Sequence, residues 1–464
     1  MFAKTLRIHF VGIGGIGMSG IAEVLLNLGY TISGSDRKIT AVTKRLAELG
    51  TSIFEGHRAE NISGADVVVT SSAIARDNPE VIEASRLHIP VIRRAEMLAE
   101  LMRLKYGIAI AGMHGKTTTT SMVATVLAAG GLDPTVVVGG RVDAMGSNAR
   151  LGKSQYLVAE ADESDRSFLK LSPILSVVTN IDREHMDCYR DMQDVENTFV
   201  EFMNRVPFYG KVVACADDAA LRALLPRVKR RVATYGARED ADFRVQTLNV
   251  VPIQSEVRDE ARALNWFRVQ YREQDLGEFQ LHVPGQHNVL NATAAVAVGI
   301  GLGVSPEHIR EALRSFRGVD RRFQQKGIVR GVTVVDDYGH HPTEIRATLA
   351  AAKQAGFERV HVIFQPHRYT RTQLLMEDFA SAFTDATSVA VLDIYAASEA
   401  PIPRITGEVL AQRIREQGNR DAQYAASFPD AVAAAVAAAR DGDMILTLGA
   451  GNVSQLGPLV LERL

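Results

Sequence analysis

GIGGIGMSG, at residues 12–20, follows the apolar run IHFV and precedes the largely apolar segment AEVLLNLG. A glycine-rich turn between a strand and a helix lets the backbone approach a diphosphate, whose oxygens the helix N-terminus then binds. Gly12, Gly14 and Gly17 fit the spacing GxGxxG, and Asp36 ends the next apolar run, where a ribose-binding acid stands in dinucleotide-binding folds. The turn predicts a Rossmann-like N-terminal domain. Its ligand stays open among a dinucleotide, another nucleotide diphosphate and a purely structural role.

Short apolar runs alternate with amphipathic segments along the rest of the chain, a pattern typical of parallel sheets with crossover helices. The expected strands are RIHFVGI, YTISGSD and ADVVVTSSA, then GIAIAG, QYLVAEAD, ILSVVTNID and KVVACADD, and finally VTVVDDY, RVHVIFQP, SVAVLDIYA and DMILTLGAG. Between about 240 and 285 the residues alternate in polarity, which predicts antiparallel strands added to the second series. The 464 residues therefore predict an α/β protein of three domains: a Rossmann-like domain at 1–104, a central P-loop ATP-binding domain at 105–318, and a Rossmann-like domain at 319–464.

The composition excludes several classes of protein. With 46% hydrophobic residues, 23% charged residues and a net charge of -2, the chain has no reason to bind nucleic acid or an anionic membrane. No apolar run reaches the roughly 18 residues of a membrane helix. The two cysteines, Cys188 and Cys215, are too few for a disulfide framework. We expect a cytoplasmic protein.

A second loop, GMHGKTTTT at residues 112–120, lies between the buried-strand pattern GIAIA and a helix. Gly115, Lys116 and Thr117 supply what a triphosphate needs: free backbone amides, an ammonium for the β- and γ-phosphates, and a hydroxyl for magnesium. The spacing is the short GxxGKT, not the standard P-loop, and a chance match is the alternative. An oxidoreductase has no use for such a loop, so it favours a nucleotide-driven enzyme.

Oxygen and nitrogen ligands follow two neighbouring expected strands. VAEADESD places Glu160, Asp162, Glu163 and Asp165 after one strand, and VVTNIDREHMD places Asn180, Asp182, His185 and Asp187 after the next. Open α/β sheets bind ligands at the carboxyl ends of their strands, and carboxylates suit magnesium. Any one of these acids alone reads as an exposed loop carboxylate, but two clusters beside a phosphate loop predict a metal site.

The motifs together resemble those of a known family. GIGGIGMSG, GMHGKTTTT, EADESD, TNIDREHMD, PGQHNVLNA, RRFQ, DDYGHHPTE and HRYTRT occur in the order found in the Mur ligases. The first motif and the last two resemble the alanine-adding branch. This resemblance implies an ATP-dependent ligase of peptidoglycan synthesis that joins L-alanine to the lactyl carboxylate of UDP-N-acetylmuramate through an acyl phosphate, giving ADP and phosphate.

The resemblance also implies roles for individual residues. The first glycine loop of the family binds the diphosphate of the UDP-sugar, which here implies Gly14, Gly15, Gly17, Met18 and Ser19, with Asp36, Ser71 and Ser72 near the nucleoside. The second binds ATP through Gly112, Met113, His114, Gly115, Lys116, Thr117 and Thr118. His287, Asn288 and Asn291 would contact adenine, although Asn288 could simply cap a helix. Arg321 and Arg322 would close over the nucleotide, with either Asp336 or Asp337 near its ribose.

The remaining implied roles concern metal and amino acid. Thr117, Glu160 and His185 resemble the ligands of Mg²⁺, with two ions expected. Tyr338, His340, Arg368 and Arg371 match positions that approach L-alanine, where a guanidinium fork can hold its carboxylate. The implied catalytic residues are Lys116, Glu160, His185 and His340, and His340 either accepts the proton of the amine or only binds. Met113 replaces a usual threonine, and Ser398 replaces a usual glycine.

Three rival interpretations stay open. A recycling ligase would attach a whole tripeptide to the same sugar nucleotide. An NAD-dependent oxidoreductase would be supported by GxGxxG and Asp36 alone. A non-catalytic sensor of UDP-sugar or ATP would need no turnover. The expected partners are UDP-N-acetylmuramate, L-alanine and ATP, with no nucleic acid and no membrane, and the chain is expected to be a monomer or a homodimer.

Overall fold

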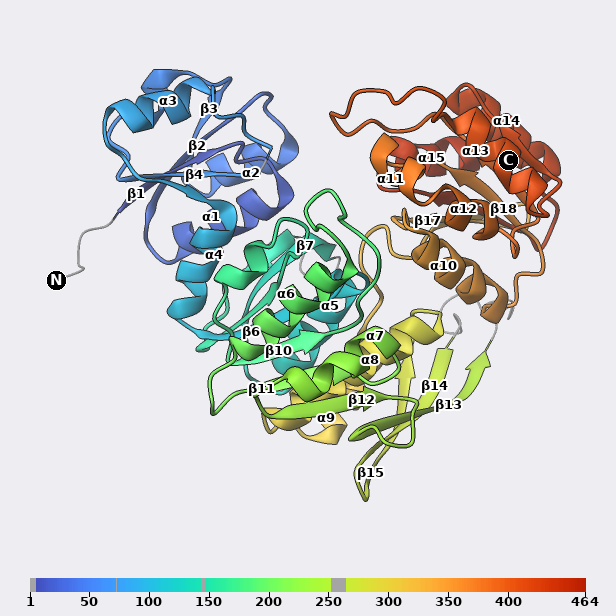
Figure 1. The fold of residues 1–464 in the computed structure, drawn as a ribbon, viewed down its shortest axis with the longest axis horizontal. Coiled ribbons are helices and arrows are strands. Elements are labelled where there is room, and N and C mark those ends of the chain that lie inside the picture. The colour runs from blue at the N-terminus through green and yellow to red at the C-terminus, as the bar shows by residue number, and fades with distance from the viewer. Residues whose placement is uncertain (1–5, 72, 143–146, 252–263) are drawn as a thin grey trace. The chain divides into compact units, whose positions relative to one another are not determined.

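The computed structural model describes residues 6–71, 73–142, 147–251 and 264–464 (Figure 1). Contacts divide the chain into two compact units. The first holds residues 1–246, 268–278 and 290–313, and the second holds 247–267, 279–289 and 314–464. The strands form three sheets, which confirms the predicted α/β class.

The first sheet has the order β3-β2-β1-β4-β5, and each strand is parallel to its neighbours, as in a Rossmann-like domain. Its strands are β1 (Arg7–Val11), β2 (Thr31–Asp36), β3 (Ser52–Glu55), β4 (Val67–Thr70) and β5 (Val91–Arg93). Its helices, blue in Figure 1, are α1 (Ile16–Asn27), α2 (Ala41–Glu48), α3 (Pro79–Arg86) and α4 (Arg94–Arg103). Helix α2 ends shortly before Gly50, whose φ of +108° favours glycine and stops the helix.

The second sheet has ten strands in the order β15-β14-β13-β12-β11-β10-β6-β9-β7-β8. Its strands are β6 (Tyr106–Ala111), β7 (Thr135–Val142), β8 (Ser147–Arg150), β9 (Tyr156–Glu160), β10 (Leu175–Val178), β11 (Lys211–Cys215), β12 (Val232–Gly236), β13 (Phe243–Val251), β14 (Leu264–Tyr271) and β15 (Gln274–Leu281). Its helices are α5 (Lys116–Ala129), α6 (Met192–Asn204), α7 (Ala219–Leu224), α8 (Gln286–Gly301) and α9 (Pro306–Ser315). The strands expected between 240 and 285 are present, but β13 pairs parallel to β12, so the prediction of antiparallel pairing is wrong for that pair. β14 and β15 are joined by two residues as in a hairpin.

The third sheet has the order β16-β17-β21-β18-β19-β20, in which β16 is antiparallel to β17 and the other neighbouring strands are parallel. Its strands are β16 (Gln324–Val329), β17 (Val332–Asp337), β18 (Val360–Phe364), β19 (Ser388–Val391), β20 (Ala422–Tyr424) and β21 (Met444–Leu448). Its helices are α10 (Pro342–Gln354), α11 (Tyr369–Leu374), α12 (Met376–Ser381), α13 (Gly407–Glu416), α14 (Phe428–Ala438) and α15 (Leu456–Arg463).

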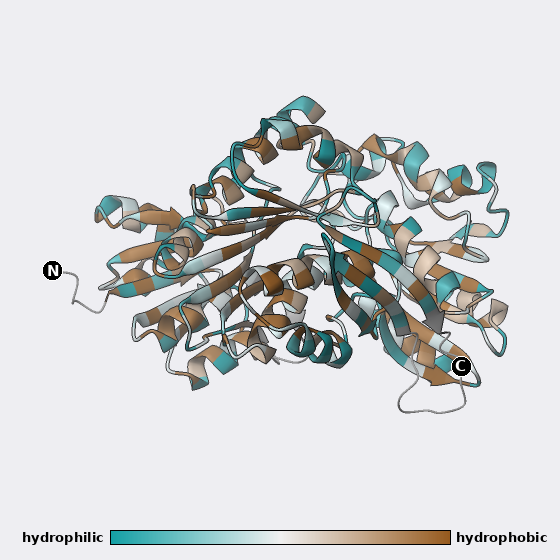
Figure 2. Ribbon diagram, turned by 90° about the horizontal axis from the view of Figure 1, so that it is seen from below, coloured by the Kyte–Doolittle hydropathy of each residue, from teal (hydrophilic) through white to brown (hydrophobic). Residues whose placement is uncertain are grey.

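Helices cover both faces of the third sheet. Leu446 of β21 packs in a core with residues of α10, α12 and α13, whereas its neighbour Ile445 packs in a second core with residues of α14 and α15. Successive strand residues point to opposite faces, so the central strands β18 and β21 are buried on both sides and are largely apolar. Figure 2 shows predominantly brown, apolar strands in the interior of the protein beside helices of mixed colour.

Candidate functional site

The loop between β6 and α5 requires glycine at two positions. Gly112 and Gly115 have φ values of +131° and +83°, which favour glycine. A Cβ atom on Gly112 would lie 2.0 Å from Oγ1 of Thr179, and one on Gly115 would lie 2.8 Å from Oδ1 of Asn291. The loop is therefore packed tightly against the residue after β10 and against α8. Its backbone is shaped by sterics, independently of any ligand.

Lys116, the first residue of α5, points back over this loop. Its Nζ donates to the carbonyl oxygens of Gly112 at 2.7 Å and Met113 at 3.2 Å, and to Oε1 of Glu163 at 2.7 Å. Burial alone would lower the pKa of Lys116, but the charge and hydrogen bond of Glu163 raise it above its ordinary value. The side chain is therefore a fixed cation held in the loop where the sequence predicts a phosphate-binding ammonium.

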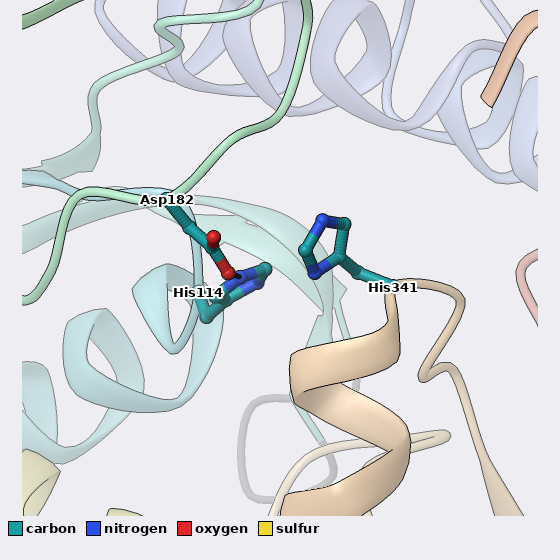
Figure 3. A group of neighbouring side chains, drawn as sticks. All are labelled: His114, Asp182 and His341. Carbon is teal, nitrogen blue, oxygen red and sulfur yellow. Dashed lines mark hydrogen bonds and ion pairs between the residues drawn. The ribbon is translucent and has the colours of Figure 1, made fainter. Parts of the chain in front are cut away.

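His114 fixes the same loop from the other side. Its backbone amide donates to Oδ1 of Asn180 at 2.9 Å, and its Nε2 lies 2.8 Å from Oδ2 of Asp182. Figure 3 shows this imidazole and carboxylate pointing toward one another; it also draws His341, the N-cap of α10. The residues after β10 therefore act on the loop through hydrogen bonds to backbone and side chain.

The acidic residues after β9 divide into different roles. Glu160 ends β9 and is the register partner of Ile110 in β6, so it lies at the strand end beside the loop. Glu163 is completely buried, and His185 Nε2 lies 3.5 Å from its Oε1. The other oxygen of Glu163, Oε2, is buried and has no hydrogen-bond partner among the described residues. Glu163 and His185 thus lie together behind the loop, while Glu160 ends the strand beside it; carboxylate oxygens and an imidazole are donors that a divalent cation can use.

The first glycine loop is also shaped by glycine contacts. The amide of Gly14 donates to Oδ2 of Asp36 at 2.8 Å, and a Cβ on Gly14 would lie 2.8 Å from the same oxygen. Gly15 at the loop tip is exposed, whereas the side chains of Met18 and Ser19 are buried. Asp36 is therefore where the sequence places it, at the end of β2, and it bonds the loop itself.

Arg94, at the start of α4, contacts both the first glycine loop and the acidic segment after β9. A Cβ on Gly17 would lie 3.1 Å from Cδ of Arg94, and Nη2 of Arg94 lies 3.1 Å from Oδ2 of Asp162. Partial burial would raise the pKa of Asp162, but the hydrogen bond from Ser164 and the charges of Lys116 and Arg94 hold it below its ordinary value. The predicted sugar neighbour Ser71 accepts a hydrogen bond on its carbonyl oxygen from Arg93. Ser72 lies outside the described residues.

In the second unit, Tyr338 lies under two guanidinium groups. The Cζ atoms of Arg321 and Arg322 lie 4.8 Å and 5.0 Å from the centre of its ring. Both acids of the DDY motif are buried: Asp336 accepts from Thr447 at 2.7 Å, and Asp337 accepts from the amides of Phe323 and Gly339, each at 2.7 Å. Burial raises the pKa of Asp337 above its ordinary value, although the charge of Arg322 opposes this.

The residues expected to bind alanine follow the carboxyl ends of β17 and β18. His340 lies 5.8 Å, ring centre to ring centre, from His367, and Nη1 of Arg371 lies 3.1 Å from Nδ1 of His367. His367 stacks on Tyr395 at 5.5 Å. Arg368, with a φ of +69°, donates its amide to the carbonyl oxygen of Tyr395 at 2.8 Å. The structure thus brings His340 and Arg371 together through His367.

Ser398 stands where a glycine is usual, so the conformation of its backbone is of interest. Ser398 has a φ of +73°, in the left-handed region where glycine is favoured. The serine therefore keeps a glycine-like conformation at a local energetic cost. In the same unit, His287 is exposed, and Nδ2 of Asn288 donates to the carbonyl oxygen of Pro284 at 2.7 Å, so Asn288 does bond locally at the start of α8.

Three family models match the chain in order along its length. The model described as the Mur ligase family, catalytic domain, matches residues 7–106, the Mur ligase middle domain matches 110–299, and the Mur ligase, glutamate ligase domain, matches 321–451. The chain belongs to the Mur ligase family.

Relatives within this family match over nearly the whole chain. The UDP-N-acetylmuramate--L-alanine ligase of Koribacter versatilis is 70% identical and covers 100% of this chain and 98% of its own length. The UDP-N-acetylmuramate--L-alanine ligase of Acidobacterium capsulatum is 65% identical, and the match covers 100% of this chain and 99% of the relative. Among structures, the UDP-N-acetylmuramate-alanine ligase of Thermotoga maritima matches with a TM-score of 0.80, 31% identity and 99% coverage of both chains. A murein peptide ligase of Psychrobacter arcticus matches with a TM-score of 0.68, 25% identity and 98% coverage of both chains.

The Mur ligase site holds residues that the sequence motifs contain but do not single out. Glu163 pairs with the P-loop lysine, and His367 lies between His340 and Arg371. Glu344 accepts from the amide of His340 at 3.0 Å. All three stand inside the motifs EADESD, DDYGHHPTE and HRYTRT, so membership of those motifs was the signal in the sequence.

Proposed function

We propose that this Mur ligase joins L-alanine to the lactyl carboxylate of UDP-N-acetylmuramate at the expense of ATP. The observation that carries the proposal is the 70% identity, over the full chain, to a relative named for that reaction. The Lys116 loop supports ATP as the driving substrate, since its backbone and ammonium have the form that a triphosphate needs.

The first glycine loop is proposed to bind the sugar nucleotide. Gly15 is exposed at the N-terminus of α1, where amides and partial positive charge favour a diphosphate. Gly14 and Gly17 flank it, and Met18 and Ser19 would contribute through the helix N-terminus because their side chains are buried. Asp36 and Ser71 are proposed near the nucleoside. Arg94 is a further candidate, since it lies against Gly17.

Mg²⁺ is proposed as the metal, with two ions. Thr117, Glu160 and His185 would hold it, and the buried Oε2 of Glu163 is a further oxygen donor of the type that Mg²⁺ prefers. When bound, Mg²⁺ supplies positive charge that offsets the charge on the phosphates. The other proposed ATP contacts are Gly112, Met113, His114, Gly115, Thr118, His287, Asn288, Asn291, Arg321 and Arg322, with Asp336 and Asp337 near the ribose.

The chemistry follows from the poor electrophilicity of a carboxylate. An oxygen of the lactyl carboxylate attacks the γ-phosphorus, the bond to ADP breaks, and an acyl phosphate forms. Lys116 stabilises the negative charge that develops during this transfer. The neutral amine of alanine then attacks the acyl carbon, phosphate leaves, and the amine loses a proton. Arg368 and Arg371 are proposed to hold the alanine carboxylate, and Tyr338 and His340 to approach its amine.

A phosphate-release assay tests this proposal. Phosphate should appear only when ATP, Mg²⁺, UDP-N-acetylmuramate and L-alanine are all present. Release with a murein tripeptide and not with alanine would favour the recycling ligase. A change of nicotinamide fluorescence on titration would favour the oxidoreductase.

The cellular context is proposed on separate grounds. Both cysteines, Cys188 and Cys215, are free thiols, as expected in the reducing cytoplasm. None of the helices in the described part of the chain is long and apolar enough to cross a bilayer. A monomer or homodimer is proposed, and the domain boundaries near 104 and 318 stay predictions.

A further inference from the structure

A hollow of about 590 Å³ opens at the amino ends of β18, β19 and β20. It is lined by His361 of β18, Ser388 of β19 and Ala422 of β20, together with residues of α13 and α14. His340, Arg368 and Arg371 instead follow the carboxyl ends of strands in the same sheet. The hollow therefore lies at the opposite end of these strands from the proposed alanine site.

Arginine dominates the charge of this hollow. Its lining includes four arginines, Arg359, Arg415, Arg420 and Arg440, and one carboxylate, Asp421. Nε of Arg359 donates to Oδ1 of Asp443 at 2.6 Å, so this arginine is already neutralised. The other three arginines are exposed, and no carboxylate in the described ranges forms an ion pair with any of them. The hollow therefore carries an excess of positive charge.

The polar wall is fixed before any ligand arrives. Nδ1 of His361 lies 2.8 Å from Oγ of Ser388, and its Nε2 lies 3.1 Å from Oδ2 of Asp443. Nη1 of Arg415 donates to the carbonyl oxygen of Ala422 at 3.1 Å, which holds that guanidinium beside the strand ends. The guanidinium groups of Arg420 and Arg440 have no such bond among the described residues and can turn to a ligand.

The opposite wall is apolar. Ala434, Ala435 and Ala438 of α14 line it, and Val362 and Ala390 continue it along the sheet. Side chains as short as alanine leave room between helix and sheet, and the resulting volume falls within the range of about 300–1,000 Å³ typical of small-molecule sites. A lone inorganic anion would fill only a small part of this space.

We propose that this hollow binds a small organic phosphate, with the phosphate on Arg415, Arg420 and Arg440 and the organic part against the alanines of α14. Guanidinium forks recognise phosphate through paired, charge-assisted hydrogen bonds. The site is independent of the proposed ligase reaction, since none of its residues belongs to the catalytic or substrate-binding sets.

Hydrogen exchange on the full-length protein tests the site, with adenosine monophosphate as the organic probe and inorganic phosphate as the second arm. We expect adenosine monophosphate to protect amides at 415–423 and 434–440, at a concentration at least about tenfold lower than phosphate requires. Because the readout is local, binding of the nucleotide at the ATP loop does not interfere.

The double substitution Arg420→Ala with Arg440→Ala should weaken this protection at least about tenfold. The matched control, Arg404→Ala with Arg463→Ala, removes two exposed arginines of the same unit outside the hollow and should leave it unchanged. Ligase turnover without adenosine monophosphate should be the same in both variants. Absence of protection in these segments, equal binding by the two double variants, or phosphate binding as tightly as the nucleotide would overturn the proposal.

Discussion

Nζ of Lys116 lies 2.7 Å from Oε1 of Glu163, and that carboxylate is completely buried. A buried carboxylate needs a partner, because burial without one costs several kcal/mol. Lys116 is that partner, and the hydrogen bonds from its Nζ to the carbonyl oxygens of Gly112 and Met113 hold the side chain over the loop. The pair therefore places a cation in the loop that we propose binds ATP, and the proposal requires the lysine to exchange partners when phosphate arrives.

Lys116→Ala should lower turnover by about two to three orders of magnitude, because it removes a cation that acts on the transferred phosphoryl group. Binding of UDP-N-acetylmuramate should be unchanged, since the first glycine loop is a separate element. Phosphate release and calorimetric titration measure the two effects. The exposed Lys44 of α2 offers a control, Lys44→Ala, which should keep both. Loss of sugar-nucleotide binding as well would show that the two loops do not serve separate ligands.

Glu163→Gln keeps the shape of the side chain but removes its charge. We expect turnover to fall about 10- to 100-fold and the Mg²⁺ concentration for half-maximal rate to rise, because the variant loses both the partner of Lys116 and a proposed oxygen donor. Rates measured across a magnesium titration check this. Glu196→Gln, on helix α6 outside the proposed site, is the matched control and should change neither turnover nor the magnesium requirement. An unchanged magnesium requirement would show that Glu163 only holds Lys116 and does not bind Mg²⁺.

The choice among the four acids of this strand end shows where sequence reasoning stops. Oδ1 of Asp162 accepts from the amide of Ser164 at 3.1 Å, and Oδ1 of Asp165 accepts from that of Ser167 at 3.0 Å. Both aspartates thereby stabilise turns of their own loop, which turns Glu163 inward. The motif predicts acids at this strand end, but which acid faces the lysine depends on turn geometry.

The fold could be predicted further than the site. Apolar runs identified most of the central strands but missed β7, β8 and β12 of the second sheet. The strands β3, β5, β16 and β20 were not predicted either. β5 and β20 have three residues each, too few for a periodic pattern, and all four lie at sheet edges. Edge strands are only partly buried, so their apolar signal is weak. Similarly, His367 gave no signal of its own, because its role depends on Tyr395, which follows a different strand.

Arg94→Ala should raise the KM for UDP-N-acetylmuramate at least about tenfold and that for ATP much less. Loss of a partly exposed ion pair to Asp162 alone would cost less than about 1 kcal/mol, or about fivefold. Loss of a charge-assisted hydrogen bond to the diphosphate would cost about 1.5–3 kcal/mol, which exceeds tenfold. Steady-state kinetics in each substrate distinguishes the two. Arg103→Ala, at the other end of α4, is the control. A rise of fivefold or less would limit Arg94 to its bond with Asp162.

Arg368→Lys should weaken the use of alanine far more than the use of ATP. Lysine keeps the charge but cannot form two parallel hydrogen bonds to a carboxylate, so we expect the KM for alanine to rise at least about tenfold. Arg404→Lys changes an exposed arginine of the same unit and should be silent. An equal rise in the KM for both substrates would remove Arg368 from the alanine site.

Glu80 should make the first sheet sensitive to acid. Its carboxylate is completely buried and accepts from Ser35 at 2.7 Å and from Asn61 at 2.6 Å. Burial alone would raise its pKa, but the hydrogen bonds of His9, Ser35 and Asn61 lower it from 4.5 to about 2. Because the folded pKa is depressed, the stabilisation is present above pH 4.5 and is lost as the pH falls toward 2.

Between pH 5 and pH 3 this single group should remove about 2 kcal/mol from the free energy of unfolding. Urea unfolding, monitored by hydrogen exchange of the β1 amides, measures the stability of this sheet. Glu80→Gln should be less stable at pH 7 but should lose that much less stability on acidification, because no carboxylate remains to be protonated there. Glu48→Gln, at an exposed position on α2, should show the same dependence of the free energy of unfolding on pH as the unsubstituted protein. If Glu80→Gln left the slope intact, the acid sensitivity of this sheet would come from other groups.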